Sequence, residues 1–229
     1  MENLPKSVQI VLRRLEEDGR EAWCVGGCVR DSLLGRTPED WDVTTSALPE
    51  QIMELFGTQA RPTGLQHGTV SVTLEGETVE VTTFRVDGTY HDHRRPDQVT
   101  FTRSLEEDLR RRDFTINAMA LNLRGELRDP FCGQSDLTAG VLRCVGEPER
   151  RFEEDALRIL RGMRFASVLG LRVEEATAMG IHRCAPLLAQ IAPERIAKEL
   201  MGLLVGARAD AVLRELSLIH ISEPTRQEA

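Results

Sequence analysis

The chain has 229 residues, a net charge of −8 and 41% hydrophobic residues, which together describe a globular protein with enough apolar material for a core. No apolar run approaches the ~20 residues that cross a bilayer, and the N-terminus lacks the apolar segment of a secretory signal. The five cysteines are scattered and odd in number, so we expect no disulfide framework and a cytoplasmic protein. The negative charge excludes a protein that coats nucleic acid through bulk positive charge, but it does not exclude local basic clusters.

The first hundred residues alternate short helical and β-rich segments. Apolar residues at helical spacing, with Gly or Pro at the ends, predict helices over residues 8–15, 29–34 and 49–56. Runs of apolar and β-branched residues predict strands over residues 22–25, 41–45, 69–74 and 78–85. The last two strands flank a Glu-Gly-Glu turn and therefore predict a hairpin, and the polar stretch 87–98 predicts a loop.

The second half of the chain has mainly helical periodicity. Ser104 with Glu107 three residues later is typical of a helix N-terminus, whereas residues 117–123 fit a strand or a helix equally well. Helices are predicted over residues 152–169, 174–184, 193–205 and 209–216. The sequence thus predicts an α+β domain over residues 1–146 and an all-helical domain over residues 147–216.

A glycine turn between the first strand and the next helix is a candidate phosphate site. Gly26 and Gly27 have no Cβ atoms, so a phosphate can approach the backbone N–H groups there. Arg30, one turn into the helix, adds a guanidinium for the same anion. A Gly-Gly turn also occurs where no ligand binds. The prediction of a phosphate site therefore depends on the acidic residues that follow in the chain.

Three acidic residues come after that turn in the sequence. Asp40 and Asp42 are two apart on a predicted strand, so their side chains share one face, and neighbouring carboxylates repel each other unless a cation lies between them. Such oxygen ligands suit Mg²⁺, and Glu80 on a later strand is a candidate third carboxylate. The alternatives are a solvated strand end for the aspartates and an exposed edge strand for Glu80.

The motifs resemble those of bacterial class II CCA-adding enzymes and poly(A) polymerases, members of the DNA polymerase β-like nucleotidyltransferase superfamily. The resemblance rests first on VGGCVRD at 25–31 and DWDVTT at 40–45. Further stretches agree in the family's order: EVTTFR at 80–85, RRDFTINAMA at 111–120, DPFCGQSDL at 129–137 and EDALR at 154–158. It implies a nucleotidyltransferase head with a mixed or antiparallel sheet, followed by a helical neck.

The resemblance also implies a role for each acidic and phosphate-binding position. Asp40, Asp42 and Glu80 would be the catalytic residues and hold two Mg²⁺ ions. Nucleotide-binding roles are implied for two sets of residues: Gly26, Gly27, Arg30, Arg112, Asp113 and Asn117 in the head, and Asp155, Arg158 and Arg161 in the neck.

Base reading is the role that the resemblance implies for Asp155 and Arg158. Their i, i+3 spacing within the predicted helix 152–169 puts them on one helix face. The alternative for Glu154, Asp155 and Arg158 is a surface ion pair on that helix. Arg195 and Glu199 match the family's last motif, and at i, i+4 we expect them to pair and to be structural.

The implied substrates are CTP and ATP, and the implied partner is the 3′ end of tRNA at its acceptor stem, with no membrane association. Poly(A) polymerase, CC-adding and A-adding activities stay open, as does a non-catalytic nucleotide- or RNA-binding module. A third alternative, nucleotidylation of a small molecule, fits Asp40 and Asp42 but does not account for the motif at residues 154–158. Family members continue into further helical domains, whereas residues 217–229 resemble a translated adapter fragment, so we expect a C-terminally truncated chain with a non-native tail.

Overall fold

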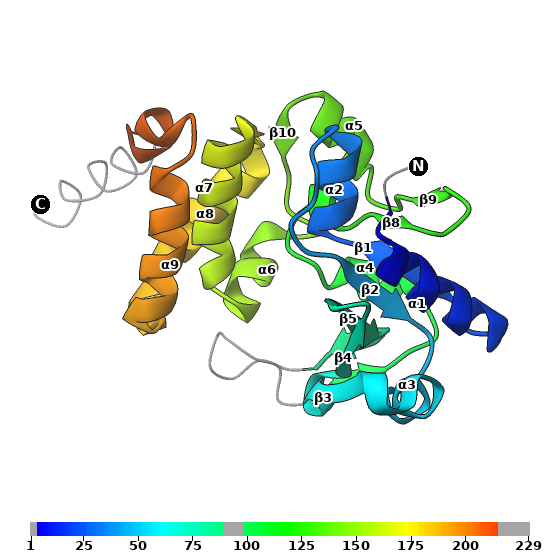
Figure 1. Ribbon diagram of the computed structural model, residues 1–229. Helices are drawn as coiled ribbons and strands as arrows, with labels where there is room; N and C mark the ends of the chain where they lie inside the picture. Colours follow the sequence, from blue (N-terminus) through cyan, green and yellow to red (C-terminus); the bar gives the residue numbers. More distant parts are fainter. Residues whose placement is uncertain (1–3, 89–98, 215–229) are drawn as a thin grey trace, which may run out of the picture. The chain divides into compact units, whose positions relative to one another are not determined.

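The computed structural model describes residues 4–88 and 99–214. They form two compact units, the first with residues 4–88 and 99–135 and the second with residues 136–214 (Figure 1). The predicted domain boundary at residue 146 stays a prediction, and the predicted non-native tail lies outside the described residues. No helix in the described ranges is long and apolar enough to cross a membrane.

The first unit combines helices with a mixed sheet. Its helices are α1 (Lys6–Glu17), α2 (Gly27–Leu33), α3 (Pro49–Phe56) and α4 (Leu105–Arg110), and α5 (Gly133–Thr138) spans the division between the units. Its strands are β1 (Ala22–Val25), β2 (Asp42–Thr45), β3 (Ala60–Gly64), β4 (Thr69–Leu74), β5 (Glu77–Thr83), β6 (Arg85–Asp87), β7 (Val99–Phe101), β8 (Ala120–Leu121) and β9 (Leu127–Arg128). Short 3₁₀ turns are η1 (Gly57–Gln59), η2 (Leu65–His67) and η3 (Thr115–Asn117).

The main sheet has the strand order β3-β4-β5-β2-β1-β8-β9 among the described residues. Strands β2 and β5 run parallel, and the other neighbours run antiparallel, which confirms the predicted mixed sheet. Helices α1 and α3 pack against the sheet and against each other. The apolar residues of α1 at helical spacing are all buried: Val8, Val11, Leu12 and Leu15.

Three elements of the first unit, β1, α3 and β4, begin and end at the residues that the sequence predicted. The predicted hairpin is formed by β4 and β5, and both residues of its turn, Glu75 and Gly76, have positive φ. Residues 117–123 contain the end of η3 and the short strand β8. The predicted loop 87–98 begins too early, because Asp87 belongs to β6, which pairs with β7; residues 89–98 lie outside the described residues.

The second unit is mainly helical. Its elements are β10 (Val141–Leu142), α6 (Pro148–Glu154), α7 (Leu157–Leu169), β11 (Arg172–Val173), α8 (Glu175–Cys184), η4 (Ala185–Gln190) and α9 (Pro193–Leu204), and residues 209–214 are helical. Buried Leu157, Leu160 and Ile191 form a core against which Ile196 and Leu200 of α9 pack. The parallel pair of β10 and β11 was not predicted, since each strand has only two residues.

Helix α8 begins at a carboxylate cap. Glu174 accepts a hydrogen bond from the backbone N–H of Thr177 at 2.9 Å, and this contact helps to lower the pKa of Glu174 against the opposing effect of desolvation. Glu174→Ala should therefore lower the free energy of unfolding of the second unit by about 1 kcal/mol, the usual effect of losing an N-cap. Urea unfolding followed by far-UV circular dichroism measures this, with exposed Glu175→Ala as control. Equal effects of the two substitutions would contradict the assignment.

Candidate active site

The predicted phosphate turn lies between β1 and α2. Gly26 has φ +81°, a conformation that residues with a Cβ rarely adopt, and α2 begins at the next residue. The first N–H groups of any helix have no acceptor within the helix, so this turn presents donors to an anion. The guanidinium of Arg30 lies beside the turn, with Nη2 3.6 Å from where a Cβ on Gly27 would be. The turn therefore has the shape that the sequence predicts.

Arg30 is buried and joins the turn to the 3₁₀ turn η3. Its Nε and Nη2 each donate to Asp31 at 2.9 Å, and its Nη1 donates to Oδ1 of Asn117 at 2.7 Å. Nδ2 of Asn117 in turn donates to Oδ1 of Asp113 at 3.1 Å. Three residues that were predicted separately to bind nucleotide thus form one hydrogen-bonded chain.

Arg112 approaches the same turn from the end of α4. Its Nη1 lies 3.3 Å from where a Cβ on Gly26 would be, so any side chain at position 26 would crowd the guanidinium. Nη2 of Arg112 donates to Oδ2 of Asp108 at 3.1 Å. Gly26, Arg30 and Arg112 therefore lie around one place, where they present a glycine turn with positive φ and two guanidinium groups.

Two of the predicted acidic residues face each other across adjacent strands. Asp42 on β2 and Glu80 on β5 are register partners of the parallel pair, so their side chains lie on the same face of the sheet, and both are exposed. The edge-strand alternative for Glu80 is wrong, because β5 lies between β4 and β2. The placement of Asp40 on the strand is also wrong, because β2 begins at Asp42 and Asp40 lies in the bend before it.

The charges around Asp42 oppose each other. The side chain of Asp42 reaches solvent, but its partial desolvation raises the pKa of the carboxyl. The positive charge of Arg112 lowers this pKa, and the negative charges of Glu80 and Asp40 raise it. The net shift of the pKa is upward. In the described ranges, no group of three or more His, Cys, Asp or Glu side chains is arranged to hold a metal ion. The structure thus places Asp40 and Glu80 within electrostatic reach of Asp42, but the three carboxylates do not form a closed cluster.

Asp155 and Arg158, the predicted base-reading pair, do not lie on one helix face as expected. The predicted helix 152–169 is interrupted between α6 and α7, and Asp155 at the break has extended backbone angles of φ −141° and ψ 103°. Oδ1 of Asp155 accepts from the backbone N–H of Leu157 at 3.1 Å, which satisfies a donor at the start of α7. The side chain thus stabilises the break that the helical pattern does not reveal.

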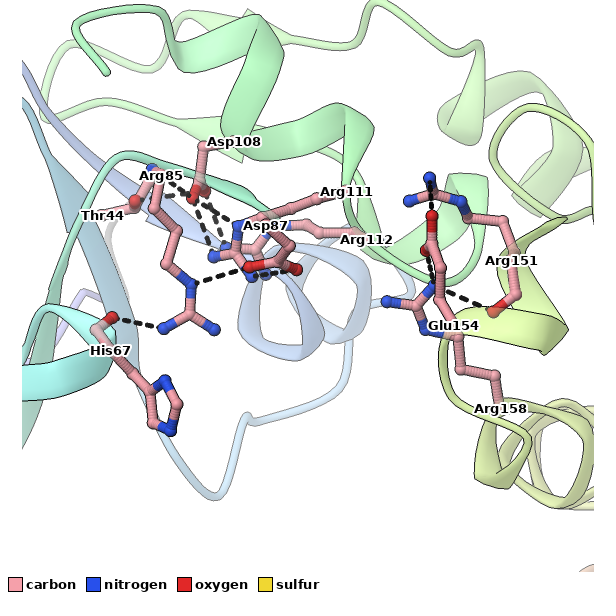
Figure 2. A network of polar contacts seen from close by, with 10 residues as sticks. All are labelled: Thr44, His67, Arg85, Asp87, Asp108, Arg111, Arg112, Arg151, Glu154 and Arg158. Atoms are coloured by element: carbon pink, nitrogen blue, oxygen red, sulfur yellow. Dashed lines mark hydrogen bonds and ion pairs between the residues drawn. The ribbon is translucent and has the colours of Figure 1, made fainter. Parts of the chain in front are cut away.

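Arg158 contacts residues before the break. Its Nη1 donates to Oε2 of Glu154 at 2.8 Å and to the carbonyl oxygen of Arg151 at 3.1 Å, and Nη2 of Arg151 contacts Oε1 of the same glutamate at 2.6 Å (Figure 2). Glu154 and Arg158 thus form the ion pair of the alternative prediction, but the pair does not lie on the surface, because Arg158 is buried. Arg161, on the next turn of α7, is half-buried, with its guanidinium over the ring of Phe165.

Arg195 and Glu199 do not pair with each other as predicted. Nη2 of Arg195 donates to Oδ2 of Asp155 at 3.2 Å, and Oε2 of Glu199 accepts from Nε of Arg164 at 2.6 Å. Both residues thus join α9 to the segment that contains the predicted base-reading motif, which is a structural role of a different kind from the one predicted.

Comparison with known families accounts for most of the chain. Residues 22–143 match the model of the poly(A) polymerase head domain. The chain belongs to the poly(A) polymerase head-domain family. Residues 170–224 match a second model, described as a probable RNA- and SrmB-binding site of polymerase A. The head-domain match contains every predicted site residue of the first unit, whereas Asp155, Arg158 and Arg161 lie between the two matched ranges.

Relatives within this family are CCA-adding enzymes. The chain is 51% identical over 210 residues to the CCA-adding enzyme of Leuconostoc mesenteroides, covering 92% of this chain and 52% of that protein. The crystal structure of the Bacillus stearothermophilus CCA-adding enzyme in complex with CTP has a TM-score of 0.85 at 44% identity, covering 93% of this chain and 51% of that one. A tRNA nucleotidyltransferase complexed with a primer tRNA and an incoming ATP analog has a TM-score of 0.73 at 30% identity, covering 92% and 60%. This chain thus spans about half the length of such relatives.

One residue of the head-domain site was missed by the sequence reasoning. Asp108 on α4 is fully buried and accepts hydrogen bonds from both Arg111 and Arg112 (Figure 2). The signal was present, since Asp108 precedes these arginines by three and four residues, the spacing at which helical side chains meet. The pattern alone, however, does not tell a buried carboxylate from an exposed one.

Proposed function

We propose that this chain transfers a nucleotide from CTP or ATP to the 3′-hydroxyl of a tRNA that lacks its terminal CCA. The observation that carries the proposal is the register pair of Asp42 and Glu80 beside the guanidinium of Arg112. Nucleotidyl transfer needs positioned phosphates and stabilisation of negative charge rather than protein nucleophiles. The names of the relatives, and the CTP, primer tRNA and ATP analog in the related structures, support this choice of substrates.

The cationic side of the site would bind the triphosphate. In this proposal the N–H groups at Gly26 and Gly27 and the guanidinium groups of Arg30 and Arg112 hold the phosphate oxygens. The 3′-hydroxyl oxygen of tRNA forms a bond to the α-phosphorus, the bond to the bridging oxygen of the β-phosphate breaks, and pyrophosphate leaves. Asp113 and Asn117, linked to Arg30, would lie near the ribose.

In this proposal the acidic side of the site would hold two Mg²⁺ ions. Asp40, Asp42 and Glu80 offer only oxygen ligands. Desolvation and, less strongly, the negative charges of Glu80 and Asp40 raise the pKa of Asp42, and a bound cation would offset that negative charge. When bound, the ions would lower the pKa of the attacking hydroxyl and stabilise the leaving pyrophosphate. The residues of the chain would orient the α-phosphate toward that hydroxyl.

Base reading would require a change of partners in the second unit. Asp155 and Arg158 carry the acceptor and donor groups that a cytosine or adenine edge needs, and Arg161 lies one turn further along α7. Asp155 is paired with Arg195, and Arg158 is paired with Glu154. We therefore propose that the incoming base replaces at least one of these contacts when it binds.

The proposal is tested by incubating the chain with Mg²⁺, α-labelled CTP or ATP, and tRNA lacking CCA. We expect labelled tRNA that is elongated at its 3′ end. Supplying each nucleotide separately distinguishes CCA addition from CC-only, A-only or poly(A) addition. CTP binding without elongation at high tRNA concentration would instead indicate a nucleotide- or RNA-binding module, and elongation would exclude that module.

A further inference from the structure

The carboxylate of Asp108 lies fully buried between two guanidinium groups. Oδ1 accepts from Nε and Nη2 of Arg111 at 3.0 and 2.8 Å, and Oδ2 accepts from Nη2 of Arg112 at 3.1 Å. The two arginines lower the pKa of Asp108 against the effect of its burial, so the group is an anion at neutral pH. Charged hydrogen bonds to a buried carboxylate restrict the conformations of the two arginine side chains, which are otherwise flexible.

The same carboxylate also contacts β2, which carries Asp42, and the first residue of β6, which follows β5 and Glu80 in the chain. The hydroxyl of Thr44, two residues beyond Asp42 on β2, lies 3.2 Å from Oδ2 of Asp108 and 3.2 Å from the carbonyl oxygen of Thr82, and it can donate to either. Oδ1 accepts from the backbone N–H of Arg85, just past the end of β5, at 3.3 Å (Figure 2). The position of Arg112 is therefore set relative to the acidic side of the site as well as to α4.

Arg112 retains unused hydrogen-bonding capacity where it approaches the glycine turn. Its Nη2 is tied to Asp108, and its Nη1 is directed at Gly26, where it lies 3.3 Å from a Cβ position. Its Nε is buried and has no hydrogen-bond partner among the described residues. A guanidinium that is anchored at one nitrogen and unsatisfied at another is suited to receive an anionic or polar ligand.

The basic run at residues 110–112 thus divides into two parts. Arg110 is exposed and pairs with Glu106 on the solvent face of α4. Arg111 and Arg112 are turned inward onto Asp108. Arg110 therefore belongs to the solvent face, whereas Arg111 and Arg112 belong to the interior around Asp108.

We propose that Asp108 is a positioning residue for nucleotide binding, which holds Arg112 at the Gly26 turn so that the guanidinium meets the incoming nucleoside triphosphate. Asp108 itself does not contact the nucleotide. This inference rests on the proposed function, because it takes a nucleoside triphosphate as the ligand of the turn. It predicts that Asp108 acts on binding only through Arg112.

A double-mutant cycle on CTP affinity tests this inference without tRNA. Equilibrium dialysis with labelled CTP gives the Kd of the wild type, Asp108→Asn, Arg112→Ala and the double variant, with Arg110→Ala as matched control. We expect each of the first two substitutions to weaken binding about tenfold, the typical effect of losing one charged hydrogen bond. The double variant should bind no more weakly than Arg112→Ala alone, since both remove the same contact, and Arg110→Ala should bind like the wild type.

The outcomes separate the inference from the function on which it rests. Wild-type affinity in Asp108→Asn, or effects that multiply in the double variant, would overturn the positioning role alone. A wild type that does not bind CTP would overturn the proposed function and this inference together. If Asp108→Asn does not fold, Thr44→Val is the alternative variant, because it removes an uncharged donor near Oδ2 of Asp108, the oxygen that Arg112 contacts. Thr44→Val should weaken CTP binding in the wild-type background but not in the Arg112→Ala background. An equal effect in both backgrounds would overturn the inference.

Discussion

Asp42→Ala is expected to lower the rate of nucleotide addition on the order of 10³-fold, because several kcal/mol of charge stabilisation at the reacting phosphate depends on this carboxylate. Asp42 is the register partner of Glu80 on the neighbouring strand, and the charges of Arg112 and Asp40 both affect the pKa of its carboxyl. Single-turnover incorporation of α-labelled CTP into tRNA lacking CCA, with Mg²⁺ present, measures the effect.

Loss of folding is not expected to explain that result. Desolvation and two negative neighbours raise the pKa of Asp42, so its removal relieves repulsion and should leave the thermal unfolding midpoint unchanged or slightly higher. Asp42→Asn keeps the size of the side chain and should be as inactive as the alanine variant. Glu39→Ala, an exposed carboxylate in the same bend as Asp40, is the control and should stay active. Wild-type rates in Asp42→Ala would refute the assignment.

Gly133→Ala is expected to destabilise the first unit by more than about 3 kcal/mol, the upper end of ordinary overpacking. A Cβ at this position would lie 2.1 Å from the carbonyl oxygen and 2.7 Å from the carbonyl carbon of Thr115, and 3.0 Å from Cγ of Met119. The backbone of Thr115 belongs to η3, which includes Asn117 of the site, so relieving the clash would move η3 or displace α5.

Urea unfolding monitored by tryptophan fluorescence measures this effect, because Trp23 and Trp41, the only tryptophans of the chain, belong to the first unit. Ser135→Ala, at an exposed position two residues along the same helix, should change the free energy of unfolding by less than about 0.5 kcal/mol. A change below about 1 kcal/mol in Gly133→Ala would show that α5 and η3 are packed less closely than the structure indicates.

The elements that the sequence predicted well are those whose ends are marked locally. Strand β1 is a short apolar run that stops at Gly26, and α3 begins at Pro49 and ends before Gly57, so composition alone sets their bounds. The break between α6 and α7 has no such marker, because Asp155 and Ala156 are both compatible with a helix. It is associated with the contact of Asp155 with Leu157 and with the ion pair to Arg195, which is forty residues away in sequence.

In the predicted site as well, positions set by a local segment were predicted correctly, whereas the partners of charged side chains were not. Gly26 and Arg30 lie where the motif predicts, because both depend on one strand-turn-helix segment. The partners of charged side chains depend on tertiary packing, which is why Glu199 pairs with Arg164 instead of Arg195. For the same reason, the burial of Asp108 cannot be read from its spacing to Arg111 and Arg112.

The most direct test of the central claim is the Mg²⁺ dependence of label transfer from α-labelled CTP to tRNA lacking CCA. We predict elongation with Mg²⁺, no elongation when EDTA replaces the ion, and recovery when Mg²⁺ is added back, because Asp40, Asp42 and Glu80 are proposed to act through bound cations. Elongation that continues unchanged in EDTA would contradict the proposed mechanism.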